Sequence, residues 1–203
     1  MGISPNQQKI SFLACTKFDC LLKSSIRTGL HTFDTTINRN VLNEKIRNVV
    51  KDLSNTSLQV GEKGLEIQFL NDKNYNGIDY YVNTDKSRVF QVLSNLINNA
   101  IKFADVNGVV TISIKGTESL LSDISDMVEK NEYAFISIKD NGSGIDPEIQ
   151  SRLFSKFATK SDIGTGLGLF IAKSIMEVHG GKISPENNKD GGGATITFSL
   201  PLD

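Results

Sequence analysis

The 203-residue sequence is poor in cysteine and has almost no net charge, and each shortage excludes a class of protein. Its two cysteines, Cys15 and Cys20, are five residues apart in a segment with helical spacing. They point to different faces of such a helix, so we expect two reduced thiols rather than a disulfide. The formal net charge of −1 provides no basic field that would attract nucleic acid or an anionic membrane.

The sequence also lacks the pattern of a membrane anchor or a targeting signal. Its apolar runs are far shorter than the ~20 residues that cross a bilayer. The N-terminus has no signal-peptide pattern. It begins Met1-Gly2, but Asn6 stands where N-myristoylation requires Ser or Thr. We therefore expect a cytosolic protein, or the cytosolic part of a longer membrane sensor.

Length and composition predict one domain with an appendage, since 38 % of the residues are hydrophobic, enough for one core. The appendage is predicted at residues 1–40, where a helical apolar stripe ends near Gly29 and has no second element to pack on. The stripe consists of Ile10, Leu13, Phe18, Leu21, Leu22 and Ile26. So short a helix is expected to pack on a partner or to be the remnant of a longer element.

The main domain is predicted at residues 41–203. Helices are predicted from residue 41, over 85–103 and over 167–178, and strands over 65–69, 109–115, 133–139 and 194–200. The elements show no β-α-β rhythm, and residues 195–200 alternate strictly. We therefore expect an α+β fold, a two-layer α/β sandwich in which helices cover one face of a mixed, mainly antiparallel sheet. Residues 117–131 form an acidic, polar insertion between two predicted strands, and we assign no role to it.

The helix over 85–103 carries a polar stripe beside its apolar one. Asn95, Asn99 and Lys102 are spaced i, i+4, i+7 and share a face. An Asn amide oxygen suits Mg²⁺, which prefers oxygen ligands and retains waters or phosphate oxygens, and Lys102 could neutralise phosphate charge. The alternative is a solvated face that happens to be rich in Asn.

A tight turn follows the predicted strand 133–139 and reads Asp140-Asn141-Gly142-Ser143-Gly144. Asp140 would be a fixed acceptor for the amino group of an adenine, and the glycines would let the base approach the backbone. The alternative is an ordinary hairpin turn, because Asn-Gly and Asp-x-Gly are common turn sequences.

A second glycine-rich turn opens the helix over 167–178 and reads Gly164-Thr165-Gly166-Leu167-Gly168-Leu169. Backbone N–H groups at the start of a helix can bind phosphate. The turn is neither a dinucleotide fingerprint, which requires glycine where Leu169 stands, nor a P-loop, which requires glycine where Ala172 stands. The alternative is a flexible linker.

Two further segments flank these turns. Phe154 and Phe157 are interpreted as core anchors for a short lid over residues 158–163 rather than as binding groups. Gly191–Thr195 leads into the last strand and is interpreted as a glycine turn, with a role beside the phosphates as the alternative.

Together these segments resemble the boxes of the catalytic ATP-binding domain of sensor histidine kinases. Its superfamily includes gyrase, heat-shock protein 90 and the mismatch-repair ATPases. Residues 85–103 resemble the N box, Asp140-x-Gly142-x-Gly144 the G1 box, Phe154-x-x-Phe157 the F box, and Gly164-x-Gly166-x-Gly168-Leu169 the G2 box. Order and spacing agree over residues 41–203, and the combination is specific although no single box is.

The resemblance implies roles for the matched residues. Asn99 would hold Mg²⁺, Lys102 would contact phosphate, and both would form the catalytic set with Asn95. Phe103 would flank the adenine, and Asp140 would bind its amino group. The other residues implied in nucleotide binding are Gly142, Gly144, Ile145, Lys160, Gly164, Thr165, Gly166, Leu167, Gly168, Leu169 and Thr195.

The resemblance also has departures. ATP-hydrolysing relatives typically have a Glu at the position of Asn95, and an amide cannot act as a general base at neutral pH. Neither histidine matches the phospho-acceptor of these kinases: His31 falls just after the predicted helix of the appendage, and His179 at a helix end is interpreted as structural. Residues 1–40 would be part of the second helix of a dimerisation hairpin with its linker.

The resemblance therefore implies a protein histidine kinase of two-component signalling. The chain would bind Mg-ATP and transfer the γ-phosphoryl group to a histidine that this chain does not evidently provide. Its partners would be a histidine-bearing hairpin domain and a response-regulator receiver domain. A nucleotide-binding module that gates a partner without catalysis is the first alternative, and a stand-alone ATPase is the second.

Overall fold

The computed structural model describes residues 36–71, 81–116, 133–158, 165–189 and 192–202, all within one compact unit, Asp34–Asp203. The predictions for the apolar stripe before residue 30, both cysteines, His31 and the insertion 117–131 fall outside the described residues. Among the helices of the described residues, none is long and apolar enough to cross a bilayer.

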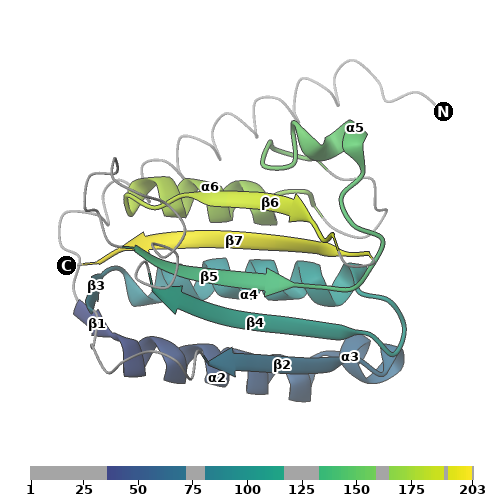
Figure 1. Cartoon of the computed structure of the whole chain (residues 1–203), viewed down its shortest axis with the longest axis horizontal. Helices are drawn as coiled ribbons and strands as arrows, with labels where there is room; N and C mark the ends of the chain where they lie inside the picture. Colours follow the sequence, from purple (N-terminus) through teal and green to yellow (C-terminus); the bar gives the residue numbers. More distant parts are fainter. Residues whose placement is uncertain (1–35, 72–80, 117–132, 159–164, 190–191, 203) are drawn as a thin grey trace, which may run out of the picture. The chain divides into compact units, whose positions relative to one another are not determined.

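A five-stranded sheet forms one layer of the domain, and three long helices cover one of its faces (Figure 1). The helices are α2 (Arg39–Thr56), α4 (Lys86–Phe103) and α6 (Gly168–Val178). The strands, in spatial order, are β2 (Glu66–Asn71), β4 (Val109–Gly116), β5 (Tyr133–Lys139), β7 (Ala194–Pro201) and β6 (Ile183–Asn187). The described elements also include α3 (Leu58–Lys63), α5 (Pro147–Gln150) and the antiparallel pair β1 (Thr36–Asn38) and β3 (Tyr81–Asn83). The predicted α+β sandwich is confirmed.

One strand pair departs from the expectation that the chain has no β-α-β unit. β2 pairs with β4 in parallel, in register from Glu66 opposite Val109 to Asn71 opposite Ile114. The other neighbours in the sheet are antiparallel. The reason is α4, which lies between β2 and β4 in the sequence. It carries the chain back to the end of the sheet where β2 began, so β4 runs in the same direction as β2. The predicted mixed, mainly antiparallel sheet is therefore correct, with one crossover.

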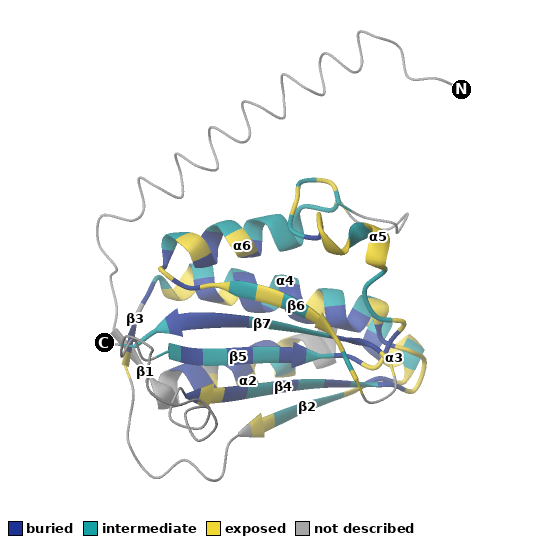
Figure 2. Ribbon diagram, turned by 45° about the horizontal axis from the view of Figure 1, so that its top comes forward, coloured by how far each residue is buried: buried dark blue, intermediate teal, exposed yellow. Residues whose placement is uncertain are grey.

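The core lies between the helices and the sheet. α4 buries one face, and β4 and β5 bury every second residue against it, whereas α5 and β6 are largely exposed (Figure 2). The buried positions are Val89, Val92, Leu93, Leu96, Ile97, Ala100 and Ile101 of α4, with Val110, Ile112, Ile114, Ala134, Ile136 and Ile138 of the strands. On the other face, the hydroxyls of Ser137 and Thr197 bond at 2.8 Å between β5 and β7. The period-2 pattern thus selects which face the helices cover.

The N-terminus of α4 is fixed by two groups. Asp85 is the N-cap, and its Oδ1 accepts from the backbone N–H groups of Ser87 at 2.8 Å and Arg88 at 3.1 Å. The backbone N–H of Asp85 donates to Nε2 of His179, at 3.2 Å. Nδ1 of His179 lies 2.8 Å from the carbonyl oxygen of Ile175 in α6. His179 is buried and its ring contacts both helices, so its role is structural.

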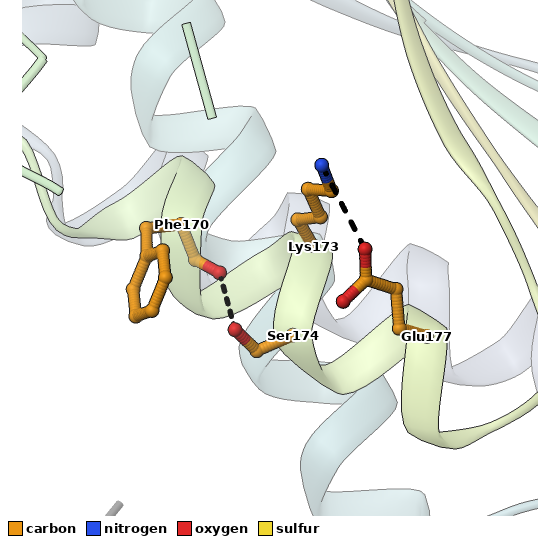
Figure 3. Close-up of polar contacts among 4 residues, drawn as sticks. All are labelled: Phe170, Lys173, Ser174 and Glu177. Atoms are coloured by element: carbon orange, nitrogen blue, oxygen red, sulfur yellow. Dashed lines mark hydrogen bonds and ion pairs between the residues drawn. The ribbon is translucent and has the colours of Figure 1, made fainter. Parts of the chain in front are cut away.

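The exposed side of α6 carries polar contacts within the helix (Figure 3). The Ser174 hydroxyl donates to the Phe170 carbonyl at 2.9 Å, and Lys173 pairs with Glu177 at 3.7 Å. A solvent-exposed pair at this i, i+4 spacing contributes only about 0.3–0.5 kcal/mol. α6 is therefore held mainly by its packing against α4 and by Ala172, Ile175 and Met176, which are buried.

Candidate functional site

A cavity of about 570 Å³ opens where the C-terminal half of α4, the end of β5 and the start of α6 meet. This volume is within the range of small-molecule sites, roughly 300–1,000 Å³. The predicted residues that line it are Asn99, Lys102, Phe103, Asp140, Gly144, Ile145, Thr165, Gly166, Gly168 and Leu169. The structure thus brings together residues from the N, G1 and G2 boxes.

Four predicted residues have other positions. Asn95, Gly142, Leu167 and Thr195 are described but do not line the cavity. Lys160 and Gly164 lie outside the described residues. The Thr195 hydroxyl donates to Oδ1 of Asn188, the residue after β6, at 2.7 Å.

The cavity-facing side of α4 presents Asn99 and Lys102 one turn apart. Within the described residues, the Asn99 amide has no hydrogen-bond partner, so its oxygen is available to a ligand in the cavity. The Lys102 ammonium lies 5.1 Å from the centroid of the Phe103 ring, a cation–π distance. Phe103 is 48 % exposed and could flank a planar ligand.

Asn95 lies on the same face of α4 but joins the helices instead of facing the cavity. Its Nδ2 donates to the backbone carbonyl of Gly168, at 3.2 Å. Gly168 is the first residue of α6 and lines the cavity. Asn95 thus fixes the start of the glycine turn relative to α4.

The C-terminus of α4 is capped by a lysine from another element. The Lys63 ammonium donates to the carbonyl oxygens of Ile101 at 3.2 Å, Lys102 at 2.7 Å and Ala104 at 2.8 Å. These carbonyls are at the negative end of the helix, where a cation is favourable. Lys63 therefore holds the turn of α4 that presents Lys102 and Phe103 to the cavity.

Asp140 follows directly after β5 and is buried at the wall of the cavity, with 8 % of its surface exposed. Its Oδ1 accepts from the backbone N–H groups of Gly142 at 2.9 Å and Ala194 at 3.3 Å. Within the described residues, no group donates to Oδ2. Burial raises the pKa of Asp140 above 3.8, the two backbone donors oppose the rise, and the charge of Asp105 adds to it.

Gly142 has a role that the sequence interpretation did not give it. A Cβ at this position would collide with the backbone carbonyl oxygen of Phe103. Gly142 is therefore the point where the turn after β5 packs directly against the end of α4. Ser143 and Gly144, the next two residues, line the cavity in its place.

The glycine turn before α6 contacts the F-box segment through its backbone. The Phe157 N–H donates to the Gly166 carbonyl at 3.1 Å, and Gly166 has φ +65°, with the Phe157 backbone where a Cβ would lie. Phe157 itself is 57 % exposed, so its interpretation as a core anchor is wrong. Leu153 is the buried residue of this segment and lines the cavity.

Some lining residues were absent from the sequence prediction. Ile138 and Ile196 are on the helix-facing side of β5 and β7, which strand alternation could have indicated. Gln59 comes from α3, which was not predicted, and nothing in the local sequence marks it. Asn98, next to Asn99 on α4, was not among the predicted site residues, and it also lines the cavity.

The family model of histidine kinase-, DNA gyrase B- and HSP90-like ATPases matches residues 84–203. The chain is 40 % identical over 129 residues to the sensor histidine kinase WalK of Bacillus subtilis, which covers 61 % of this chain and 19 % of WalK. It is 33 % identical over 183 residues to the heme sensor protein HssS of Staphylococcus saprophyticus, covering 88 % and 34 % of the two chains.

A solved structure is also similar. The catalytic domain of histidine kinase ThkA, in a nucleotide-free crystal form, aligns with a TM-score of 0.63 and 31 % identity, over 82 % of this chain and 95 % of that one. The chain therefore spans nearly all of a catalytic domain but only 19 % and 34 % of the two curated relatives.

Proposed function

Because the chain belongs to the family of histidine kinase-, DNA gyrase B- and HSP90-like ATPases and carries a histidine kinase catalytic ATP-binding domain, we propose that it binds Mg-ATP and transfers the γ-phosphoryl group to a histidine. The acceptor histidine is placed on a hairpin domain, of the same protein or of another chain. A response-regulator receiver domain would take the phosphoryl group next, as in two-component signalling.

The observation that carries this proposal is the meeting of three groups around one cavity. Asp140 provides a buried acceptor, Asn99 and Lys102 provide an amide and a cation, and Thr165–Gly168 provide backbone at a helix start. A base, a metal and phosphates require this set of groups. Asp140 lies 41 positions after Asn99 and 25 positions before Thr165 in the sequence, so the fold alone assembles these groups.

Each group has a distinct role in the proposal. Asp140 accepts a hydrogen bond from the adenine amino group through Oδ2, the carboxylate oxygen to which no described residue donates, while Phe103 flanks the base. Lys102 neutralises phosphate charge, and the N–H groups at the start of α6 contact phosphate oxygens. Phosphoryl transfer depends mainly on such positioning and charge neutralisation.

The residues present fit a magnesium ion that arrives with the nucleotide. The described residues hold no group of three or more His, Cys, Asp or Glu that could bind a metal by themselves. Asn99 lines the cavity, and its amide oxygen, phosphate oxygens and water would form the shell that Mg²⁺ prefers. The bound ion would neutralise phosphate charge.

Transfer is favoured over hydrolysis by the chemistry of Asn95. Its amide donates to the Gly168 carbonyl and carries no base that could take a proton from water at neutral pH. The phosphoryl group is therefore expected to pass to a side chain of the acceptor domain.

Calorimetric titration of Mg-ATP into the wild type and Asp140→Asn, followed by labelled ATP with a histidine-bearing hairpin domain, tests this function. We expect binding by the wild type, weaker binding by the variant, and label on the hairpin. Binding without transfer would favour the non-catalytic gating module. Steady phosphate release without acceptor would favour a stand-alone ATPase, and absence of binding would contradict the proposal.

A further inference from the structure

The turn Asp140–Ile145 carries the proposed adenine acceptor, yet it lies beyond the end of the β5 ladder. Its backbone joins β7 through one bond, from the Asp140 N–H to the Ala194 carbonyl at 2.9 Å. Ser143, Gly144 and Ile145 then line the cavity without further pairing to a strand. Side chains must therefore hold this turn, and two consecutive asparagines, the last residue of β6 and the residue after it, contact its two ends.

Asn187 holds the far end of the turn. Its Oδ1 accepts from the backbone N–H of Ile145 at 2.6 Å, and its Nδ2 donates to the carbonyl of the same residue at 3.0 Å. Both backbone polar groups of Ile145 are thus paired by one amide. Only an amide provides a donor and an acceptor in this arrangement.

Asn188 holds the near end. Its Nδ2 donates to the carbonyl oxygens of Asp140 at 2.8 Å and Gly192 at 2.9 Å. Its Oδ1 accepts from the Thr195 hydroxyl at 2.7 Å, which fixes the orientation of the amide. The hydroxyl of the predicted site residue Thr195 is therefore linked to the turn through Asn188.

We propose that Asn187 and Asn188 are positioning residues of the nucleotide site, an inference that rests on the proposed function. Neither lines the cavity. By fixing both ends of the turn before a nucleotide arrives, they hold the Asp140 carboxylate toward the base. A site ordered in advance loses less conformational entropy on binding.

The structure offers a charge-matched control for the test. Asn188→Asp keeps the oxygen that accepts from the Thr195 hydroxyl. It replaces the Nδ2 group, which donates to two backbone carbonyls, with a second oxygen that can only accept. Asn141→Asp adds the same charge in the same turn, while its Oδ1 can still accept from Val109 N–H, now at 3.1 Å. Asn187→Ala removes both contacts with Ile145 and serves if Asn188→Asp does not fold.

The first measurement needs no nucleotide. Amide hydrogen exchange at Ile145 and Gly142 should be faster in Asn187→Ala and Asn188→Asp than in the wild type, and unchanged in Asn141→Asp. Unchanged exchange in the first two variants would overturn the proposal. This result is independent of whether the protein binds ATP.

The second measurement separates positioning from general support. ATP affinity is compared with that of the purine riboside triphosphate that lacks the 6-amino group. Because the bond to Asp140 is made only by ATP, Asn188→Asp should lose about tenfold in ATP affinity and much less for the analogue. Equal losses for both nucleotides would overturn the proposal. A wild type that binds neither would contradict the proposed function, and the exchange result would still decide on the two asparagines.

Discussion

The carboxylate of Asp140 shows how the surroundings of one side chain set its chemistry. Burial at the cavity wall raises its pKa, and the N–H groups of Gly142 and Ala194 oppose the rise by stabilising the charge. An acceptor with two protein donors on one oxygen is held in a fixed orientation. Burial of the charged carboxylate is unfavourable, but the same buried position places it at the cavity wall, where we propose that it binds the adenine amino group.

ATP affinity is expected to decrease on acidification. The decrease should begin at a higher pH than it would if Asp140 had the ordinary pKa of an aspartate. The ionised carboxylate is the form that accepts from the adenine amino group, so affinity should fall as the pH drops through the raised pKa of Asp140. Calorimetric titrations from pH 8 to 5 would measure it. Asp140→Asn should bind about 10–100-fold more weakly at neutral pH and lose this pH dependence. Parallel pH profiles of the two proteins would contradict the assignment.

The same raised pKa predicts the opposite trend for folding. The native state holds the proton more tightly than the unfolded chain, so the contribution of Asp140 to stability falls as pH rises from about 3.8 through the raised pKa. Asp140→Asn keeps an oxygen for both backbone donors. It should therefore be at least as stable as the wild type at pH 7 in thermal denaturation, which also checks that its weaker binding does not come from unfolding.

A methyl group at Gly142 is expected to be far more harmful than one at Gly61. In Gly142→Ala the Cβ collides with the Phe103 carbonyl, so α4 or the turn must shift, at about 1–3 kcal/mol or more. Gly61→Ala places its Cβ in open space on helix α3 and should stabilise by about 0.5–1 kcal/mol. Urea denaturation of both variants measures the difference, and equal stabilities would contradict the packing described.

Among the elements, α4 has both of its ends tied to other parts of the domain. Asp85 and His179 fix its start, and the Lys63 ammonium binds three carbonyls at its end. The last turn carries Lys102 and Phe103, so the position of α3 affects the cavity through this cap.

Lys63→Met is expected to lower stability and nucleotide affinity together. The aliphatic stem is retained, but three carbonyls at the end of α4 lose their cation, at about 1–3 kcal/mol. Lys86→Met is the matched control, because Lys86 is exposed in the first turn of the same helix, where a cation is slightly unfavourable. Thermal denaturation and ATP titration of both variants provide the measurement, and equal behaviour would mean that the cap is dispensable.

In the whole molecule, residues far apart in the sequence line the same cavity, from Gln59 in α3 to Ile196 in β7. A ligand that contacts α4, the turn after β5 and the start of α6 would be lost on unfolding. Its binding free energy should therefore add to the stability of the entire domain.

Mg-ATP at about 100 times its Kd is expected to raise the Tm of the wild type by roughly 5–10 °C. The magnesium-dependent part of this shift should disappear in Asn99→Ala, because the amide is the protein ligand that we propose for the ion. Scanning calorimetry with ATP, in magnesium and in chelator, measures both parts. An unchanged magnesium effect in the variant would contradict the assignment of Asn99.

The elements that the sequence predicted well are those with a strong period. Helix 85–103 and strands 133–139 and 194–200 appear within a residue of their predicted bounds, because an apolar stripe with a cap or turn at its end is a local signal. Short elements such as α3 and β6 were missed. They have too few residues to show a period, and they are stabilised by contacts with distant segments.

The sequence by itself determined the fold class and the turns that surround the cavity, since apolar period and turn chemistry are set by residues a few positions apart. Only the tertiary structure decided the parallel pairing of β2 with β4, the cap from Lys63, the contact of Asn95 with Gly168 and the hold of Asn187 and Asn188 on the turn after β5. These side-chain contacts join residues 38 to 41 positions apart for Lys63, 73 for Asn95, 42 for Asn187 and 48 for Asn188. A side chain's partner at such separation follows from how the layers pack, and no local pattern encodes it.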